Sequence, residues 1–420
     1  MNLTLQDPFA VAKEFPDTHV NTLTSGHSVV IQFSHNGDYL ASGVTDGSIV
    51  IYDLSTHGGV AAHLTGGHVR PVTSLSWSRC GRYLLSTARD WRCKLWDLSR
   101  ALEGAEAVTA EIKFDGPAWM ATMHPYEHQW MAASLIDQDP VFIDFSSSPP
   151  VVHQLATDPL GSEPKPEKHV TLAVTFTPSG RYLLTGTSKG WMNIFEVDET
   201  GSKPPHLVRS FKVCNGNIKS LCVSANGRKL AVNSSDRIIR QINMPDMYNT
   251  APDDWEFEVE HKYQDVVNRL QWNSVAFNHN GEFLCASSFG NSSHDLYLWE
   301  THMGSLTKIL EGSSEELVDV KWNFRRCMIG STGLDSGHIY LWSVTFPQKW
   351  SALAPDFVEV EENIEYQEGE GEFDIVDDSE LDRKRQEQQD YDVDILTPET
   401  TDARGFELEP RFVIPIDYYK

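Results

Sequence analysis

The sequence predicts an all-β fold, a seven-bladed β-propeller, followed by an acidic and largely disordered C-terminal tail. Two observations support this prediction. A strand–turn–strand pattern recurs between Ser28 and Val344, and its period is close to that of propeller blades. The formal charge of the chain is −26, and residues 351–420 alone hold 22 acidic against 6 basic side chains. A body of ordinary composition is therefore joined to a tail of different composition.

Seven segments of the body share one register, in which an apolar strand end is followed by a polar turn and a second strand. In chain order they are FSHNGDYLASG from Phe33, WSRCGRYLLST from Trp77, MHPYEHQWMAAS from Met123, FTPSGRYLLTG from Phe176, VSANGRKLAVN from Val223, FNHNGEFLCAS from Phe277 and WNFRRCMIGST from Trp322. The third strands that follow end 43 to 57 residues apart, between Asp53 and Ser343. Blades repeat about every 40–45 residues, so the longer intervals indicate inserted loops.

The clearest repeat is GHVRPVTSLSWSRCGRYLLSTARDWRCKLWD, which runs from Gly67 to Asp97 and resembles the WD repeat. In that family a histidine, a strand hydroxyl, an aspartate and a tryptophan hydrogen-bond in series. The matching positions are His68, Thr87 or its neighbour Ser86, Asp90 and Trp96, with Thr87 taken as the hydroxyl. Each member left unpaired in the interior would cost about 1–3 kcal/mol, so we expect a structural role for them.

A closed ring is expected, because an open propeller would expose unpaired sheet edges. The last repeat ends in HIYLWSV and shows no fourth strand before Pro347. We expect the N-terminal segment, residues 1–20, to supply that strand through NLTLQDPF. The propeller would then occupy residues 21–347.

The body shows no pattern of an enzyme site. P-loop, G-x-S-x-G, H-E-x-x-H and dinucleotide-binding patterns do not occur, and the six cysteines are scattered without metal-ligand spacing. We therefore expect no catalytic residue, cofactor, metal or small-molecule substrate. No apolar run predicts a membrane span or a signal peptide, which favours the cytosol or nucleus. The prediction is a binding platform.

One rim of the propeller is predicted to be basic. Its cationic residues fall in turns that propeller geometry places together, and they are Arg70, Arg89, Arg92, Lys189 and Arg237. Such a rim would suit nucleic acid, chromatin or an acidic partner. The alternative is that these are solvated turn residues paired with nearby aspartates.

The tail is predicted to fold only on binding. Its charge prevents a core of its own, yet apolar side chains recur in it, namely Trp350, Phe357, Ile364, Tyr366, Phe373, Ile375, Val393 and Ile395. Burying one Phe or Ile contributes roughly 1.5–3 kcal/mol, so several together can exceed the roughly 2–5 kcal/mol that ordering costs. The acidic side chains would steer the segment towards basic pockets.

The motifs of the tail resemble the retinoblastoma-binding-protein-five/Swd-one family of COMPASS subunits. They are W-S-A-x-A-P-D-F at 350–357, E-N-I-E-Y at 362–366 and E-x-E-F-D-I at 370–375, and SSDRIIR at 234–240 and DVVNR at 265–269 agree in the body. The resemblance implies a non-catalytic, nuclear subunit of a SET-domain methyltransferase complex that modifies lysine four of histone three. It also implies contact with the nucleosome.

The same resemblance implies three docking segments. In residues 348–364, an activation segment would contact the SET domain through Trp350, Ala354, Pro355, Asp356, Phe357, Glu362, Asn363 and Ile364. In residues 365–380, an acidic segment would bind the SPRY-domain subunit through Glu365, Tyr366, Glu368, Glu370, Glu372, Phe373, Asp374 and Ile375. In residues 381–420, a second WD-repeat subunit would bind Asp392, Val393, Asp394 and Ile395.

Other interpretations stay open. The acidic tail suits a WD-repeat histone chaperone or a general chromatin adaptor, which would bind free histones with strong salt dependence. Asp382 to Gln386, DRKRQ, suits a short nuclear import signal as well as a plain solvated stretch.

Overall fold

The computed structural model describes residues 15–136, 138–147, 149–157, 170–198, 203–265, 267–290, 295–344, 379–380, 382–383 and 412–415. The chain divides into two units, one of residues 13–345 with 412–420 and the other of residues 1–12 with 346–411. Of the second unit only residues 379–380 and 382–383 are described. The first unit is the propeller.

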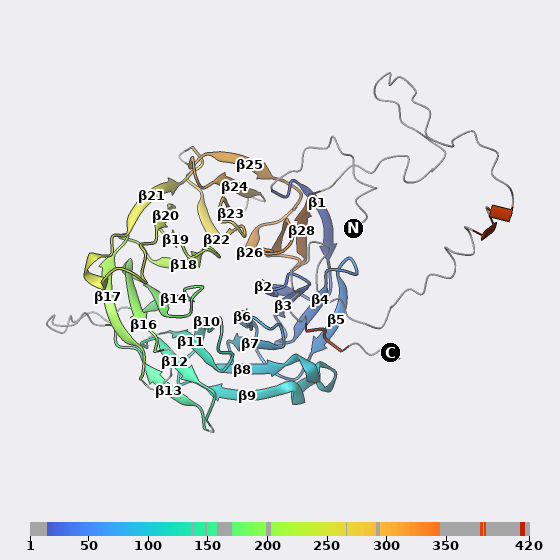
Figure 1. Cartoon of the computed structure of the whole chain (residues 1–420), viewed down its shortest axis with the longest axis horizontal. Coiled ribbons are helices and arrows are strands. Elements are labelled where there is room, and N and C mark those ends of the chain that lie inside the picture. Colours follow the sequence, from blue (N-terminus) through green and yellow to red (C-terminus); the bar gives the residue numbers. More distant parts are fainter. Residues whose placement is uncertain are drawn as a thin grey trace, which may run out of the picture. The chain divides into compact units, whose positions relative to one another are not determined.

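Seven antiparallel sheets of four strands each form a ring in the described part of the chain, which confirms the predicted fold class (Figure 1). Blade 1 consists of β2 (Ser28–Phe33), β3 (Tyr39–Val44), β4 (Ile49–Asp53) and β5 (Gly59–Leu64). Blade 2 consists of β6 (Val72–Trp77), β7 (Tyr83–Ala88), β8 (Arg92–Asp97) and β9 (Val108–Lys113). Blade 3 consists of β10 (Ala118–Met123), β11 (Trp130–Leu135), β12 (Val141–Asp144) and β13 (Val151–Gln154).

Blades 4 to 6 follow the same order from the inner strand outwards. Blade 4 consists of β14 (Thr171–Phe176), β15 (Tyr182–Thr187), β16 (Trp191–Glu196) and β17 (His206–Lys212). Blade 5 consists of β18 (Ile218–Val223), β19 (Lys229–Ser234), β20 (Ile239–Asn243) and β21 (Glu258–Tyr263). Blade 6 consists of β22 (Gln271–Phe277), β23 (Phe283–Phe289), β24 (Leu296–Glu300) and β25 (Leu306–Leu310). The 3₁₀ segments η2 (Leu98–Ala107) and η3 (Pro252–Asp254) lie in the connections of blades 2 and 5.

Blade 7 is closed by the beginning of the chain. Its strands are β26 (Leu317–Trp322), β27 (Met328–Gly333), β28 (Ile339–Ser343) and β1 (Thr18–Leu23). β1 runs antiparallel to β28, with Leu23 opposite Ile339. The closing strand is therefore not NLTLQDPF, which lies outside the described residues. THVNTL contains β-branched residues and places Leu23 in the core, and it reaches blade 7 directly before blade 1 begins.

The second strand of a blade shows why these residues form sheet interiors. β3 reads YLASGV and is buried along its whole length, because it packs against a neighbouring blade on each face. At Gly43 an added Cβ would lie 2.7 Å from a methyl of Val72 in blade 2, so only glycine fits between the blades. In the outer strand β9, VTAEIK, burial alternates instead, because half-buried and exposed residues follow each other along the strand.

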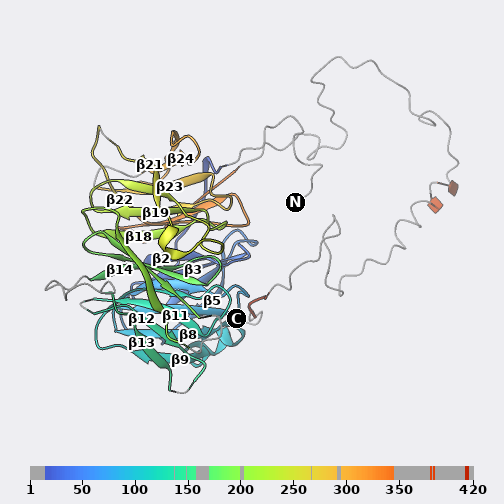
Figure 2. The ribbon, with the colours of Figure 1, turned by 60° about the vertical axis from the view of Figure 1, so that its left-hand side comes forward.

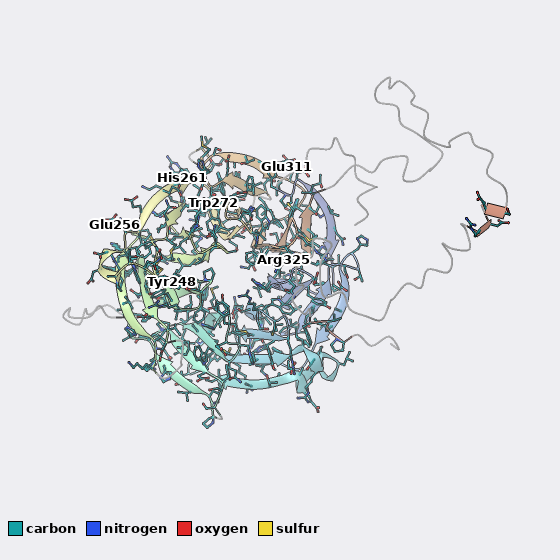
Figure 3. The ribbon with its side chains drawn as sticks, in the orientation of Figure 1. Tyr248, Glu256, His261, Trp272, Glu311 and Arg325 are labelled. Atoms are coloured by element: carbon teal, nitrogen blue, oxygen red, sulfur yellow. The ribbon has the colours of Figure 1, made fainter. Side chains whose placement is uncertain are left out.

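Large aromatic side chains pack within blade 6 and against blade 5. Trp272, labelled in Figure 3, lies on the inner strand of blade 6. It is fully buried and packs edge-on against Tyr297 and Trp299 of the same blade at centroid distances of 5.2 and 5.1 Å, and the ring of Trp299 lies 5.3 Å from that of Tyr263 in blade 5. No helix in the described part of the chain is both long and apolar enough to cross a membrane.

Candidate functional site

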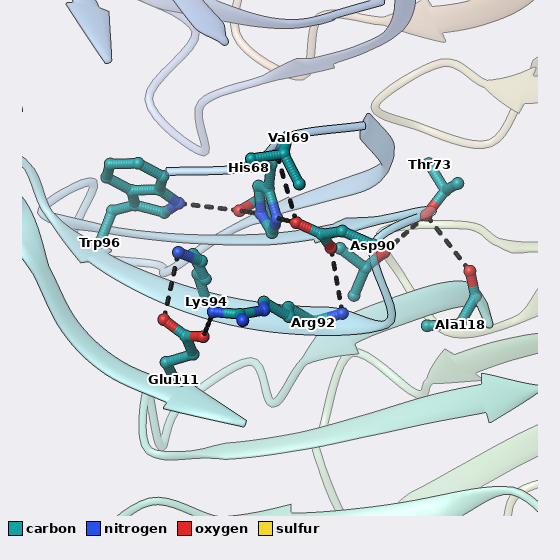
Figure 4. Close-up of polar contacts among 11 residues, drawn as sticks. His68, Val69, Thr73, Asp90, Arg92, Lys94, Trp96, Glu111 and Ala118 are labelled. Carbon is teal, nitrogen blue, oxygen red and sulfur yellow. Dashed lines mark hydrogen bonds and ion pairs between the residues drawn. The ribbon is translucent and has the colours of Figure 1, made fainter. Parts of the chain in front are cut away.

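A buried polar chain in blade 2 is the most chemically distinctive group of the propeller (Figure 4). His68 lies in the connection before β6, with Nδ1 3.0 Å from Asp90 Oδ2 and Nε2 2.8 Å from Ser86 Oγ. Trp96 on β8 donates its indole N–H to the same Ser86 oxygen at 2.8 Å. With the Nδ1 proton on the carboxylate side, Ser86 donates to Nε2 and accepts from Trp96, so every member is paired.

The hydroxyl of this chain is Ser86 and not Thr87, which corrects the predicted set. Successive side chains of a strand face opposite sides of the sheet, so only one of the two can reach the histidine. Thr87 points to the other side, where its Oγ1 lies 2.6 Å from Ser74 Oγ and 2.9 Å from Thr73 Oγ1.

The geometry of this hydrogen-bonded group in blade 2 fits a structural role. Burial opposes ionisation of Asp90, yet its hydrogen bonds with His68 and with two backbone N–H groups lower the pKa of its carboxyl overall. Ser86 has an exposed fraction of 0% and shares its oxygen with Trp96, so no substrate can reach it. Among the described residues, no group of three or more His, Cys, Asp or Glu side chains could hold a metal ion.

In blade 7 a single carboxylate, which the sequence did not predict, accepts hydrogen bonds from the turn between the second and third strands. Glu315, in the connection before β26, accepts the backbone N–H groups of Asp335 and Ser336 at 2.7 Å each and the hydroxyl of Tyr340 at 2.9 Å. Burial raises the pKa of the Glu315 carboxyl, but its hydrogen bonds lower this pKa by more, so the pKa falls overall. The carboxylate comes from the loop before the blade and not from the turn inside it, so the repeat pattern gave no signal.

The predicted basic residues all lie at one end of the strands. Because the strands alternate in direction, the turn from second to third strand and the connection to the next blade share a rim, which we call the upper rim. Four of the predicted residues are exposed there, and they are Arg70, Arg89, Lys189 and Arg237. Arg92 differs, because it forms an ion pair with Glu111, which also binds Lys94 at 3.1 Å.

The upper rim also carries exposed apolar side chains that the sequence analysis did not select. Trp91, exposed to 43%, lies in the turn between Arg89 and Arg92. Exposed apolar residues elsewhere on the rim are Val69, Trp119, Val267, Phe289 and Leu334. Exposed arginine and tryptophan side chains therefore occur together at blade 2, a composition that is enriched in interaction surfaces.

Two residues in the turns between second and third strands on this rim have an unusual backbone conformation. Trp91 and Arg237 have φ angles of 66° and 71°, at the turn position that Gly47 and Gly190 occupy in other blades. A left-handed conformation costs a non-glycine residue about 1 kcal/mol or more. Retaining a large side chain there at that cost supports a role for both on the surface. A signal was present in the sequence, because both break the glycine pattern of this turn.

All three docking motifs predicted for the tail, within residues 350–364, 365–375 and 392–395, lie outside the described residues. The same is true of DRKRQ apart from Asp382 and Arg383.

Comparison with known proteins defines the family. The family model "WD domain, G-beta repeat" matches residues 17–53 and 60–97. COMPASS component SWD1 of Saccharomyces cerevisiae is 42% identical over 426 residues, which cover 100% of this chain and 98% of that protein. The retinoblastoma-binding protein 5 homolog of Drosophila melanogaster is 32% identical, over 94% of this chain and 76% of that protein.

A solved structure agrees with this result. The crystal structure of the Cps50 (Swd1) beta-propeller domain of Myceliophteria thermophila superposes with a TM-score of 0.71 and 41% identity, covering 77% of this chain and 99% of that chain. The predicted resemblance is thus confirmed across propeller and tail, and the chain belongs to the family of COMPASS component SWD1 and the retinoblastoma-binding protein 5 homologues.

Proposed function

We propose that this chain is a non-catalytic scaffold and activating subunit of a nuclear methyltransferase complex that modifies lysine four of histone three. The observation that carries the proposal is the 42% identity to a COMPASS component along the whole chain, including the acidic tail. A relative in Schizosaccharomyces pombe, similar at 42% identity over 99% of this chain, is named a Set1 complex component. A WD propeller alone supports many functions, so the extension of the match over the tail is what favours this one.

The tail is the proposed activating element. Residues 348–364 would lie against the SET domain, residues 365–380 would bind the SPRY-domain subunit, and residues 392–395 would bind a second WD-repeat subunit. Several weak contacts on one chain become a stable assembly, because each raises the effective concentration of the next. Holding the SET domain in its productive geometry would raise turnover without a catalytic group from this chain.

The upper rim is proposed to face the nucleosome. Arg70, Arg89, Lys189 and Arg237 are exposed and suited to phosphate contacts, and the exposed Trp91 adds an apolar contact in the same turn as Arg89. Arg92 is assigned to the ion pair with Glu111 and not to this surface.

Calorimetric titration of the SPRY-domain subunit tests the acidic segment. Phe373→Ala with Ile375→Ala is expected to abolish binding, because both apolar anchors are lost while the charge is kept. Gln367→Ala, in the same stretch but outside the predicted anchors, is the matched control and should bind as the unmodified chain does. Equal affinity of all three chains would refute the assignment.

A histone chaperone is the second candidate, favoured by the tail charge of 22 acidic against 6 basic residues. It predicts binding of free histones that weakens steeply with salt and is indifferent to Phe373. The same pair of variants separates the two functions, since only the docking function depends on the apolar anchors.

A further inference from the structure

The end of the chain returns to the propeller. Residues 412–415 belong to the same unit as the blades and lie beside β5 in both views (Figures 1 and 2). Ile414 is exposed to only 1% and shares a hydrophobic cluster with Tyr39 of blade 1 and Leu98 of blade 2, against which Phe412 also packs. The adjacent Val413 is exposed to 69%. The alternation of inward and outward side chains is that of an extended peptide laid in a groove.

A short turn in blade 1 and a long connection in blade 2 form the two sides of the groove. Blade 1 turns from β4 to β5 within a few residues, whereas blade 2 inserts the ten-residue η2 between β8 and β9. Leu98, Ala101 and Ala107 of η2 are buried in the cluster that contains Ile414. Tyr39 of blade 1 belongs to the same cluster, so residues of both blades surround Ile414.

A polar contact fixes the position of the peptide. The backbone N–H of Ile414 donates to the hydroxyl of Tyr39 at 3.2 Å, and the two residues are 375 positions apart in the chain. Burial raises the pKa of Tyr39, and the nearby Asp53 and Asp38 raise it further, against the opposing effect of the Ile414 N–H. The phenol is therefore neutral at physiological pH, and its oxygen accepts the amide proton.

We propose that the groove between blades 1 and 2 is a binding site for a short apolar peptide of the pattern Phe-x-Ile-Pro, and that its ligand is the chain's own residues 412–415. The C-terminal region is then held to the propeller at both of its ends. A segment held in this way loses less entropy on binding than one with a free end, and its motifs stay concentrated near the propeller. This inference does not depend on which partner the acidic segment binds.

Hydrogen exchange on the full chain tests the proposal. The amides of residues 412–414 are expected to be protected, and Ile414→Asp should speed their exchange about tenfold or more, because it removes a buried branched side chain. Tyr39→Phe removes the acceptor alone and should speed it about two- to tenfold. Val413→Asp introduces the same charge one residue away, on the exposed side, and should leave exchange within about twofold.

A peptide titration gives an independent reading. A chain ending at Arg411 keeps all seven blades, and the relative's propeller domain forms a structure by itself. A synthetic peptide of residues 409–420 should bind it, and the Ile414→Asp peptide should bind about tenfold more weakly. Equal exchange in the Val413→Asp and Ile414→Asp chains, or equal binding of the two peptides, would overturn the proposal. Protection that falls on dilution would assign the segment to a second copy and contradict docking within one chain.

Discussion

Ser86 is the residue on which the polar chain of blade 2 depends. Its oxygen pairs with both His68 and Trp96, so Ser86→Ala leaves a ring nitrogen and an indole N–H unpaired in the interior. We expect a loss of about 2 kcal/mol or more in the free energy of unfolding, measured by urea titration. Ser55→Ala removes an exposed serine of a neighbouring blade and should change it by about 0.5 kcal/mol or less. Equal effects would contradict the assigned role.

Asp97 makes folding depend on pH. Its carboxylate is paired with Arg82 at 2.6 Å, and this hydrogen bond is the main reason that its pKa falls from 3.8 to about 2. A lowered pKa in the folded state stabilises the fold above pH 3.8, and this contribution is lost as the pH falls towards about 2.

Thermal unfolding of Asp97→Asn checks that window. The amide cannot ionise, so this variant should be less stable than the unmodified chain at pH 7 and the difference should narrow between pH 3.8 and about 2. A difference that stays constant over this range would show that Asp97 does not contribute in this way.

At the residue scale, the sequence predicted that His68, Asp90 and Trp96 belong to the hydrogen-bonded group of blade 2. It did not predict which of two neighbouring residues supplies the hydroxyl. Ser86 and Thr87 are equally suited by chemistry, and as consecutive residues of β7 they face opposite sides of the sheet, where one contacts His68 and the other contacts Ser74. Spacing in a repeat does not reveal which side of the strand meets the histidine.

β1 is the element that closes the ring. Leu23 is buried at its end, in a cluster with Ile339 and Leu341 of β28, whereas Val20 is exposed on the same strand. We expect Leu23→Ala to cost about 2–3 kcal/mol in unfolding free energy because it opens a cavity where the ends of the ring meet. Val20→Ala is the matched control and should cost about 0.5 kcal/mol or less. Similar losses would place the closure elsewhere.

Strands could be predicted from the sequence where burial on both faces imposes a repeated pattern of apolar residues. The inner strands of each blade repeat closely enough to set the blade count, since both faces of their sheets pack against neighbours. β1 is an outer strand with a mixed pattern of burial, so nothing in THVNTL separates it from other N-terminal segments. The return of Ile414 joins residues 375 positions apart, a contact that local patterns cannot contain.

At the scale of the whole molecule, the upper rim predicts a salt-dependent contact with nucleosomes. Arg70→Glu with Arg89→Glu should weaken binding at every DNA sequence and reduce the slope of log affinity against log salt by about 2, one for each lost phosphate contact. Arg228→Glu, exposed in a turn on the opposite rim, is the control. If the control lowers the slope as much as the double variant, the nucleosome faces the other rim.

The long connection of blade 5 shows how far the body departs from a plain propeller. It carries η3 and the exposed Tyr248, which is labelled in Figure 3. Trp255 anchors it, because this side chain is fully buried and packs edge-on against Tyr182 of blade 4. Such connections add surface without altering the ring of seven sheets.

We propose that the tail activates a methyltransferase and that the propeller donates no catalytic group. Reconstitution of the SET-domain complex with the full chain, and with a chain ending at Pro347, tests it most directly. Methylation of lysine four of histone three should rise with the full chain and stay near the level without this subunit when the shortened chain is used. Equal methylation by both chains would contradict the account.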